Sequence, residues 1–303
     1  MRFASVSVDL DEIPHYFAIH GLDAPSGPEA GLVYDVALAR LRALADAAGI
    51  PLTLFAIGSD LARFEAAGAL RAAAAAGHEI GNHTLDHRYD LVRLGRDEIR
   101  RQIEDGARAI EEAAGERPVG FRAPGYTISD EVFDVLREVG VAYDASVFPC
   151  PPYFLAKTAA LAAIALRGRE SKSILDTPRV LLSPTRPYRI GRPYWTRGEG
   201  LLEMPVQVTR GLRLPFIGTS VTAAGPARAR ILARMCVGEP LVNLELHGID
   251  VLDESDGLAA LRPHQLDVRI AKDRKIEAIL AVIEELKRAG YTFVTMRDAA
   301  AQL

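Results

Sequence analysis

Short apolar runs alternate with longer segments of helical periodicity along almost the whole chain. The first run, residues 2–8, predicts a strand, and residues 34–48 carry apolar side chains at helical spacing before Gly49 and Pro51. The alternation continues, with further strands expected at 52–58, 78–84, 119–125, 141–146, 201–208, 240–246 and 291–296, and further helices at 59–77, 95–114, 130–140, 226–236 and 272–289. Strands separated by helices of this length favour parallel pairing through right-handed crossovers.

Seven or eight such units favour a closed α/β barrel. A glycine-rich dinucleotide loop does not follow the first strand, which argues against an open doubly wound sheet. We therefore expect residues 1–303 to form a single distorted (β/α)7-8 barrel whose functional side chains gather at the carboxyl ends of the strands. Ser59 and Ser129 each precede an expected helix and are predicted to cap it.

Residues 148–200 are too long for an ordinary connection and are rich in proline, arginine and aromatic residues. We interpret them as a lid or insertion over the barrel mouth. Within them, residues 153–169 predict an apolar helix with a basic end, which is too short to cross a bilayer but could lie at a membrane interface. A lid helix packed on its own barrel is the alternative.

Composition limits the partners and the compartment. A net charge of −4 and a pI near 6 argue against a nucleic-acid partner held by phosphate neutralisation. Cys150 and Cys236 lie far apart without metal-ligand spacing, as reduced thiols do. The first residues lack the pattern of a secretory leader, so we expect a cytoplasmic location.

Two carboxylates, Asp9 and Asp11, end the first expected strand. Because side chains alternate along a strand, both point to one side and Leu10 points away. Like charges this close repel each other unless a cation, a shared proton or water relieves the repulsion. A strand end solvated by water is one interpretation, and a bound cation is the other.

His83 and His87 follow the third expected strand and are four residues apart. On a helical turn this spacing would place both imidazoles, which are common nitrogen ligands for zinc, on one face. The ends of strands one and three share a mouth in a barrel, so Asp9 or Asp11 can complete an Asp-His-His set with open positions. Such a set is what a hydrolytic metal site needs, and the remaining aspartate could act as general base. A solvated or core histidine pair is the alternative.

Four short motifs in order resemble the polysaccharide deacetylase superfamily, also called the NodB homology domain or carbohydrate esterase family 4. They are SVDLDE at 7–12, HTLDH at 83–87, RAPG at 122–125 and LELHGID at 244–250. The resemblance implies that Asp11, His83 and His87 bind a divalent metal. One oxygen and two nitrogen ligands suit zinc, with cobalt, nickel, manganese or iron as alternatives.

The same resemblance assigns the other roles at the site. Asp9 would be the general base, and Arg122 would pair with its carboxylate and orient it. A backbone N–H of Gly125 or Tyr126 would donate to the oxyanion, and His247 would be the general acid that protonates the leaving amine.

One family motif, an Asp-x-x-Asp-Trp-like stretch that supports the acid histidine, is not found in this sequence. Glu203 in LLEMPV or Asp250 would then tune His247, and Glu245, which alternates with His247 on one strand face, could also serve. Asp144 could line the mouth. The residues alone do not rank these carboxylates.

The resemblance implies a metal-dependent hydrolase that removes an acetyl or formyl group from an amino sugar. Lipid-linked and nucleotide-linked sugars both remain open as substrates, as does contact of residues 153–169 with the inner membrane. The alternatives are an allantoinase-like hydrolase of another C–N bond and a barrel that binds a glycan without turnover. Asp9 and His247, neither of them a ligand in this scheme, argue against the silent barrel. His15 and His20 could supply a further ligand or be ordinary loop residues.

Overall fold

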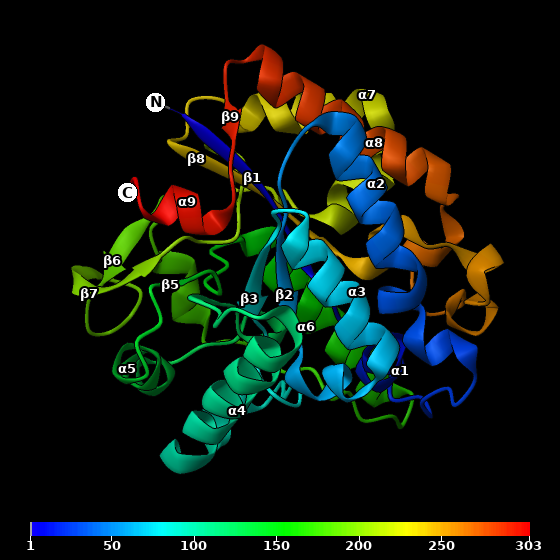
Figure 1. The fold of residues 1–303 in the computed structure, drawn as a ribbon, viewed down its shortest axis with the longest axis horizontal. Coiled ribbons are helices and arrows are strands. Elements are labelled where there is room, and N and C mark those ends of the chain that lie inside the picture. Colours follow the sequence, from blue (N-terminus) through cyan, green and yellow to red (C-terminus); the bar gives the residue numbers. More distant parts are fainter. Residues whose placement is uncertain (1) are drawn as a thin grey trace.

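A computed structural model describes residues 2–303 as a curled sheet enclosed by helices (Figure 1). Neighbouring strands follow the order β6-β7-β5-β4-β3-β2-β1-β8, and β9 also pairs with β1. Only β6 and β7 pair antiparallel within this described part of the chain. The strands are β1 (Phe3–Asp9), β2 (Thr53–Ala56), β3 (Glu79–Asn82), β4 (Gly120–Phe121), β5 (Tyr143–Asp144), β6 (Tyr188–Ile190), β7 (Arg197–Glu203), β8 (Leu241–His247) and β9 (Thr292–Phe293).

The longer helices form an outer layer around this sheet. Along it α7 packs on α8, α8 on α2, α2 on α3, α3 on α4 and α4 on α5 (Figure 1). The α-helices are α1 (Ile13–Ile19), α2 (Leu38–Ala48), α3 (Phe64–Ala75), α4 (Arg96–Ala114), α5 (Asp130–Glu138), α6 (Pro151–Leu166), α7 (Gly218–Cys236), α8 (Lys272–Arg288) and α9 (Met296–Ala300). The alternating order confirms the α/β barrel class expected from the pattern of the sequence.

The barrel is distorted because its strand ladder is incomplete between β7 and β8. The segment that connects β7 to α7 lies there and makes two isolated bridges, Val208 with Pro215 and Ile217 with Glu245. The sheet therefore curls around its interior without a continuous ring of paired strands. The distortion of the barrel that we expected thus consists of an incomplete strand ladder.

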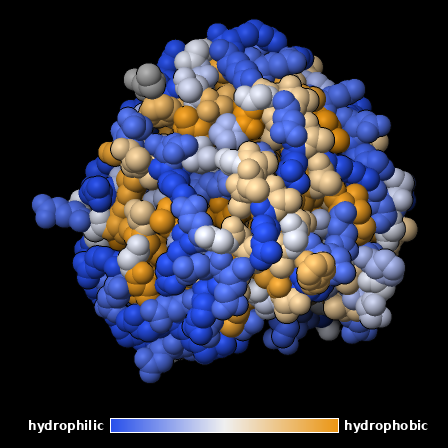
Figure 2. All heavy atoms as spheres, viewed as in Figure 1, coloured by the Kyte–Doolittle hydropathy of each residue, from blue (hydrophilic) through white to orange (hydrophobic). Residues whose placement is uncertain are grey.

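Alternation along β1 separates the apolar core from the barrel interior. Ala4, Val6 and Val8 belong to the large apolar cluster that includes the surrounding helices, and Ser7 instead contacts the buried guanidinium of Arg122. All seven residues of the strand are buried, as expected for a parallel strand covered on both faces. Hydrophilic side chains cover most of the face shown in Figure 2, with apolar side chains in small separate groups.

Several sequence predictions need correction. Ser59 does not cap α3, because a 3-10 turn at Gly58–Ala62 precedes that helix, which begins only at Phe64. Helix α7 begins eight residues before the expected 226, with a kink at Gly225 ahead of Pro226. The hairpin strand β6 was not expected at all. Ser129 does cap α5, since its Oγ accepts a hydrogen bond from the backbone N–H of Val132.

Residues 148–200 contain α6, a 3-10 turn at Pro178–Leu182, β6 and the start of β7. Helix α6 confirms the apolar helix expected at 153–169, although it ends at Leu166. Only Ile164 of its sixteen residues is fully buried. From residue 2 onward, every helix is too short or too polar to span a bilayer.

Candidate active site

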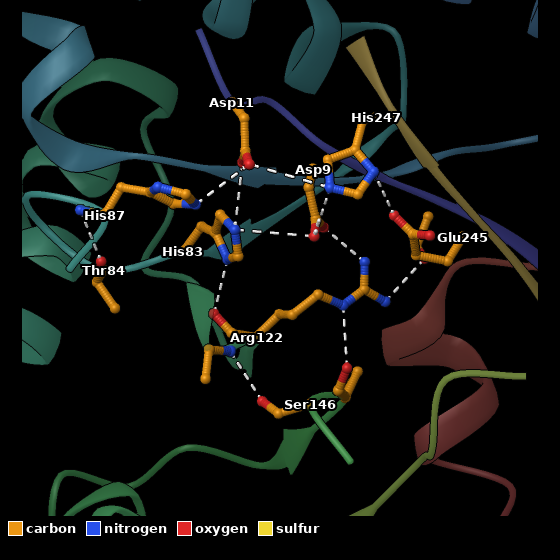
Figure 3. A network of polar contacts seen from close by, with 12 residues as sticks. Asp9, Asp11, His83, Thr84, His87, Arg122, Ser146, Glu245 and His247 are labelled. Carbon is orange, nitrogen blue, oxygen red and sulfur yellow. Dashed lines mark hydrogen bonds and ion pairs between the residues drawn. The ribbon is translucent and has the colours of Figure 1, made fainter. Parts of the chain in front are cut away.

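The carboxyl ends of four parallel strands, β1, β3, β4 and β8, supply the side chains of the site (Figure 3). Asp9 ends β1 and Asp11 follows it, while His83 and His87 follow β3. Arg122 comes directly after β4, and His247 ends β8, where it is the register partner of Asp9. Parallel strands share one C-terminal edge, which is why residues more than 200 positions apart in the sequence meet here.

Asp11, His83 and His87 form one compact group of metal-ligand type. The Asp11 carboxylate lies between the two imidazoles, with Oδ1 3.3 Å from His83 Nε2 and Oδ2 3.2 Å from His87 Nε2 (Figure 3). All three residues are buried. An ion with bonds of ~2.1 Å in tetrahedral geometry holds its ligand atoms about 3.4 Å apart, so these separations fit a zinc-sized cation.

The hydrogen bonds around this group leave its ligand atoms available. His83 Nδ1 is 2.7 Å from the carbonyl oxygen of Arg122, so this nitrogen carries the proton and Nε2 presents a lone pair. Asp11 Oδ1 and His87 Nε2 are buried without hydrogen-bond partners in the region from residue 2 to 303. Burial acts to raise the pKa of Asp11, but the two imidazoles lower it well below its usual value. The carboxylate is therefore ionised, as a metal ligand must be.

The two histidines lie on a turn, not on the helical turn that their spacing suggested. Thr84 and His87 both have positive φ, at 71° and 50°. Thr84 holds this shape, because its N–H donates to Asn82 Oδ1 and its Oγ1 accepts from the N–H of His87. The two imidazoles therefore face the same side because side-chain hydrogen bonds hold the turn in shape, and not because the segment is helical.

Asp9 is fixed by the buried side chain of Arg122. Arg122 Nη1 donates to Asp9 Oδ1 at 2.6 Å, Nη2 donates to Ser7 Oγ at 2.9 Å, and Nε donates to the carbonyl of Ala145 at 3.0 Å. The guanidinium also lies over the ring of Phe55. Asp9 Oδ2 remains directed toward the site, 3.7 Å from His83 Nε2 and 4.0 Å from His247 Nε2.

Of the carboxylates proposed to tune His247, only Glu245 contacts its imidazole. Glu245 Oε1 lies 2.9 Å from His247 Nδ1 (Figure 3). Asp250 Oδ2 instead accepts from the backbone N–H of His247, and Glu203 lies beside its register partner Asp144 on β5. Burial alone would lower the pKa of His247, but the Glu245 carboxylate raises it well above its ordinary value. The imidazole is therefore held as a cation.

The loop after Arg122 carries the two candidate oxyanion donors. The N–H of Tyr126 donates to the carbonyl of Ala123 at 3.2 Å, whereas the N–H of Gly125 has no acceptor in the described residues 2–303. Gly125 has φ +63°, and an added Cβ would lie 2.9 Å from the ring of Tyr89. From α6, Lys157 Nζ donates to the Gly125 carbonyl at 3.0 Å, a contact that sequence reasoning missed.

His15 lies on α1 and His20 is the C-cap residue of that helix, and the two have different surroundings. The His15 ring is 4.3 Å from the ring of His87, centroid to centroid, and burial lowers the pKa of His15 to about 3. His15 therefore packs against the metal-ligand group as a neutral ring. His20 Nε2 is 3.0 Å from Gln265 Oε1 and takes no part in that group.

Known proteins match the chain at the levels of sequence and fold. A family model described as "Polysaccharide deacetylase" matches residues 32–143, which include His83, His87, Arg122 and the oxyanion loop. Asp9, Asp11 and His247 lie outside this range.

Two curated relatives match parts of the chain. A peptidoglycan-N-acetylglucosamine deacetylase of Bacillus cereus is 41% identical over 64 residues, covering 21% of this chain and 29% of that protein. A chitooligosaccharide deacetylase of Sinorhizobium fredii is 36% identical over 94 residues, covering 31% of this chain and 42% of that protein. The chain thus spans less than half the length of either relative.

A crystal structure from Mycobacterium smegmatis, assigned to the polysaccharide deacetylases, superimposes on 99% of this chain and 90% of its own. The TM-score is 0.61 and the sequence identity 20%, so this likeness shows the fold. The family match over residues 32–143 thus agrees with the resemblance that the four motifs indicated, and the structural likeness shows that the chain has the fold of these deacetylases.

Proposed function

We propose that the protein is a metal-dependent hydrolase that removes a small N-acyl group, acetyl or formyl, from an amino sugar. The observation that carries the proposal is the position of Asp9. One oxygen of its carboxylate is held by Arg122, and the other faces both the metal-ligand group and His247. A proton acceptor, a cation site and a proton donor thus meet at one point.

Asp11, His83 and His87 would hold the metal. Asp11 Oδ1 and His87 Nε2 are buried without a hydrogen-bond partner among the described residues, and the distances from the Asp11 oxygens to the two imidazoles fit a divalent cation. Such an ion would polarise the acyl oxygen and lower the pKa of an attacking water toward ~7. Asp9 Oδ2 accepts the proton of that water. Arg122 keeps the acceptor in place, because three hydrogen bonds fix its own guanidinium.

The remaining residues act on the substrate. The N–H of Gly125 donates to the oxygen of the acyl group as negative charge develops there. His247, held protonated by Glu245, gives its proton to the departing nitrogen. The products are the free amino sugar and acetate or formate.

Acyl release tests the proposal directly. We expect the purified protein to release acetate or formate from N-acylated amino sugars, and a chelator to abolish the release until a divalent metal is restored. Asp9→Asn should lower kcat by at least about 10²-fold with metal content unchanged, whereas His83→Ala should lose the metal. Full activity after chelation, or in Asp9→Asn, would contradict the proposal.

Asp86 provides a matched control for the acidic variants. It lies between the two histidines in the sequence, but its carboxylate accepts from Gln102 Nε2 and does not belong to the ligand group. Asp86→Asn should therefore keep both metal content and turnover close to those of the wild-type protein.

For the substrate we favour a lipid-linked sugar presented at an anionic membrane surface, with residues 148–200 as a lid. Helix α6 supports this proposal because Leu155 and Leu166, eleven residues apart on one face, are 69% and 89% exposed. Arg167, Arg169 and Lys172 follow on the chain, giving a basic end beside an apolar stripe. The Lys157–Gly125 contact joins the same helix to the site.

Sedimentation with vesicles tests this substrate proposal separately. We expect binding to vesicles that contain anionic lipid, weakened by salt and by a Leu155→Ser, Leu166→Ser double variant. Phe64→Ser is the control, because Phe64 is equally exposed but lies on α3. Equal sedimentation of wild type and double variant would rule out α6 as the contact.

A further inference from the structure

Three buried tyrosine hydroxyls near the site have no hydrogen-bond partner among the described residues. They belong to Tyr16 on α1, Tyr89 two residues after His87, and Tyr126 in the loop after Arg122. Each tyrosine is only 5–7% exposed, and none of the three hydroxyls meets a hydrogen-bond partner anywhere in residues 2–303. An unsatisfied buried polar group is costly, so three around one site require a physical explanation.

The three rings surround the reacting groups. The Tyr16 and Tyr126 rings lie 6.5 Å and 6.3 Å from the His247 ring, and the Tyr89 ring lies 4.7 Å from the His87 ring. Tyr89 also packs against Gly125. These aromatic walls therefore enclose the space between the acid histidine, the metal-ligand group and the oxyanion loop.

Carboxylates lie near two of these rings. Burial, and then the charges of Asp11 and Asp250, raises the pKa of Tyr16 well above its usual value. For Tyr126, burial and the charges of Glu245 and Asp9 raise the pKa in the same way. None of the three hydroxyls makes a hydrogen bond to these carboxylates.

Most buried tyrosines elsewhere in residues 2–303 have a hydroxyl that is hydrogen-bonded within the protein. The hydroxyls of Tyr143, Tyr188, Tyr194 and Tyr291 donate to Glu79, to the carbonyl of Tyr194, to Asp176 and to the carbonyl of Glu239, respectively. One further unpaired hydroxyl, that of Tyr34, belongs to a tyrosine whose pKa is raised by burial and by Asp60. Within residues 2–303, three of the four unpaired tyrosine hydroxyls thus belong to rings around the candidate site.

We infer that Tyr16, Tyr89 and Tyr126 are specificity residues that hydrogen-bond the hydroxyl and ether oxygens of a neutral sugar ring carrying the amide. This inference rests on the proposed function. Neutral hydroxyls on aromatic walls suit an uncharged ring with polar edges. The nearby Asp9, Asp11 and Glu245 carboxylates disfavour an anionic substituent at this point, so any phosphate of the substrate must lie farther from the amide.

Single Tyr→Phe variants test the inference, because each removes one hydroxyl and keeps the ring. We expect each of Tyr16→Phe, Tyr89→Phe and Tyr126→Phe to lower kcat/KM about fivefold for the methyl glycoside of N-acetylglucosamine. The same variants should change kcat/KM less than twofold for N-cyclohexylacetamide, which has the amide but no ring hydroxyls. Tyr291→Phe is the control, because its hydroxyl is paired inside the chain far from the site.

Binding to Asp9→Asn protein separates this inference from the proposed reaction. In that background, ligand-observed NMR should show weaker sugar binding in each Tyr→Phe variant, whether or not the wild-type protein hydrolyses the sugar. Three results would each overturn the inference. They are turnover of the sugar that no Tyr→Phe change affects, an equal loss of kcat/KM for both amides, and no binding of the sugar at all. Hydroxyl-dependent binding without turnover would instead refute the proposed hydrolase and leave the sugar contacts standing.

Discussion

At the scale of single residues, the site works by giving neighbouring acids different partners. Asp9 is bound to a guanidinium, Asp11 faces two imidazoles, and Glu245 faces the Nδ1 side of His247. Each carboxylate is buried, so its contacts are made with protein groups and not with bulk solvent. In the proposed reaction, one functional group, the carboxylate, thus serves as proton acceptor, metal ligand and support for an acid.

The pair Glu245–His247 leads to a prediction about pH. Glu245→Gln keeps a hydrogen-bond acceptor but removes the charge that raises the pKa of His247. Because the proposed reaction needs protonated His247, activity should fall as pH rises through this pKa, and the fall should begin at lower pH in the variant. We expect the alkaline limb of the kcat profile to move down by at least about one pH unit.

Glu203→Gln is the matched comparison for this profile. Glu203 was also a candidate for tuning His247, but its carboxylate accepts from the N–H of Val147 and lies beside Asp144. Its removal should leave the alkaline limb in place. If the alkaline limb moved in Glu203→Gln and not in Glu245→Gln, Glu203 and not Glu245 would be the carboxylate that supports His247.

Much of this site could be predicted from local sequence, and what the prediction missed has a physical cause. Asp9, Asp11, His83, His87 and Arg122 lie at or just after strand ends that apolar periodicity reveals. The contact of Lys157 with Gly125 has no such signal, because it joins a surface helix to a loop 32 residues away. The choice among the carboxylates that could support His247 required the distances in the structure. Alternation along β8 places Glu245 correctly but cannot exclude Asp250.

At the scale of elements, helix caps show where local patterns suffice. Ser129 and Ser59 look alike in the sequence, each a serine before an amphipathic segment. Only Ser129 caps its helix, because the chain after Ser59 first makes a 3-10 turn that packs against α4. A tertiary contact therefore decides the outcome at Ser59, and local propensity decides it at Ser129.

This difference predicts unequal effects on stability. Ser129→Ala should lower the free energy of unfolding by about 1 kcal/mol, since it removes the acceptor for the N–H of Val132. Ser59→Ala should change it by less than about 0.5 kcal/mol. Urea unfolding followed by circular dichroism measures both, and equal losses in the two variants would disprove the structural distinction.

At the scale of the whole molecule, barrel curvature brings distant parts of the chain together. It also buries acidic side chains in the interior, at a cost in stability. The family match at residues 32–143 holds only part of the site, and the first and eighth strands supply the rest. Alternation of strands and helices predicts this assembly. The gap between β7 and β8 and the β6 hairpin were not predictable, because they depend on how far the sheet can curl before its last strands cease to pair.

The barrel interior also carries acids that bind no cation in our scheme, above all the register pair Asp144 and Glu203. Burial, and then the charge of Asp144, raises the pKa of Glu203 well above its usual value, and burial also raises the pKa of Asp144. The folded protein therefore keeps a proton on this pair at pH values where the unfolded chain has released it. Because the folded state then binds more protons, stability falls as pH rises above the pKa values of the unfolded acids.

Glu203→Gln should remove much of this pH dependence. The glutamine side chain can still accept from Val147 and can donate to Asp144 without holding a titratable proton. We expect the variant to gain stability relative to wild type at pH 8 and to gain less at pH 5, by about 1.4 kcal/mol for each unit of pKa elevation removed. Urea unfolding at the two pH values measures the difference. A gain that is equal at pH 5 and pH 8 would mean that the pair is ionised in the folded barrel, with Arg122 balancing both Asp9 and these two acids.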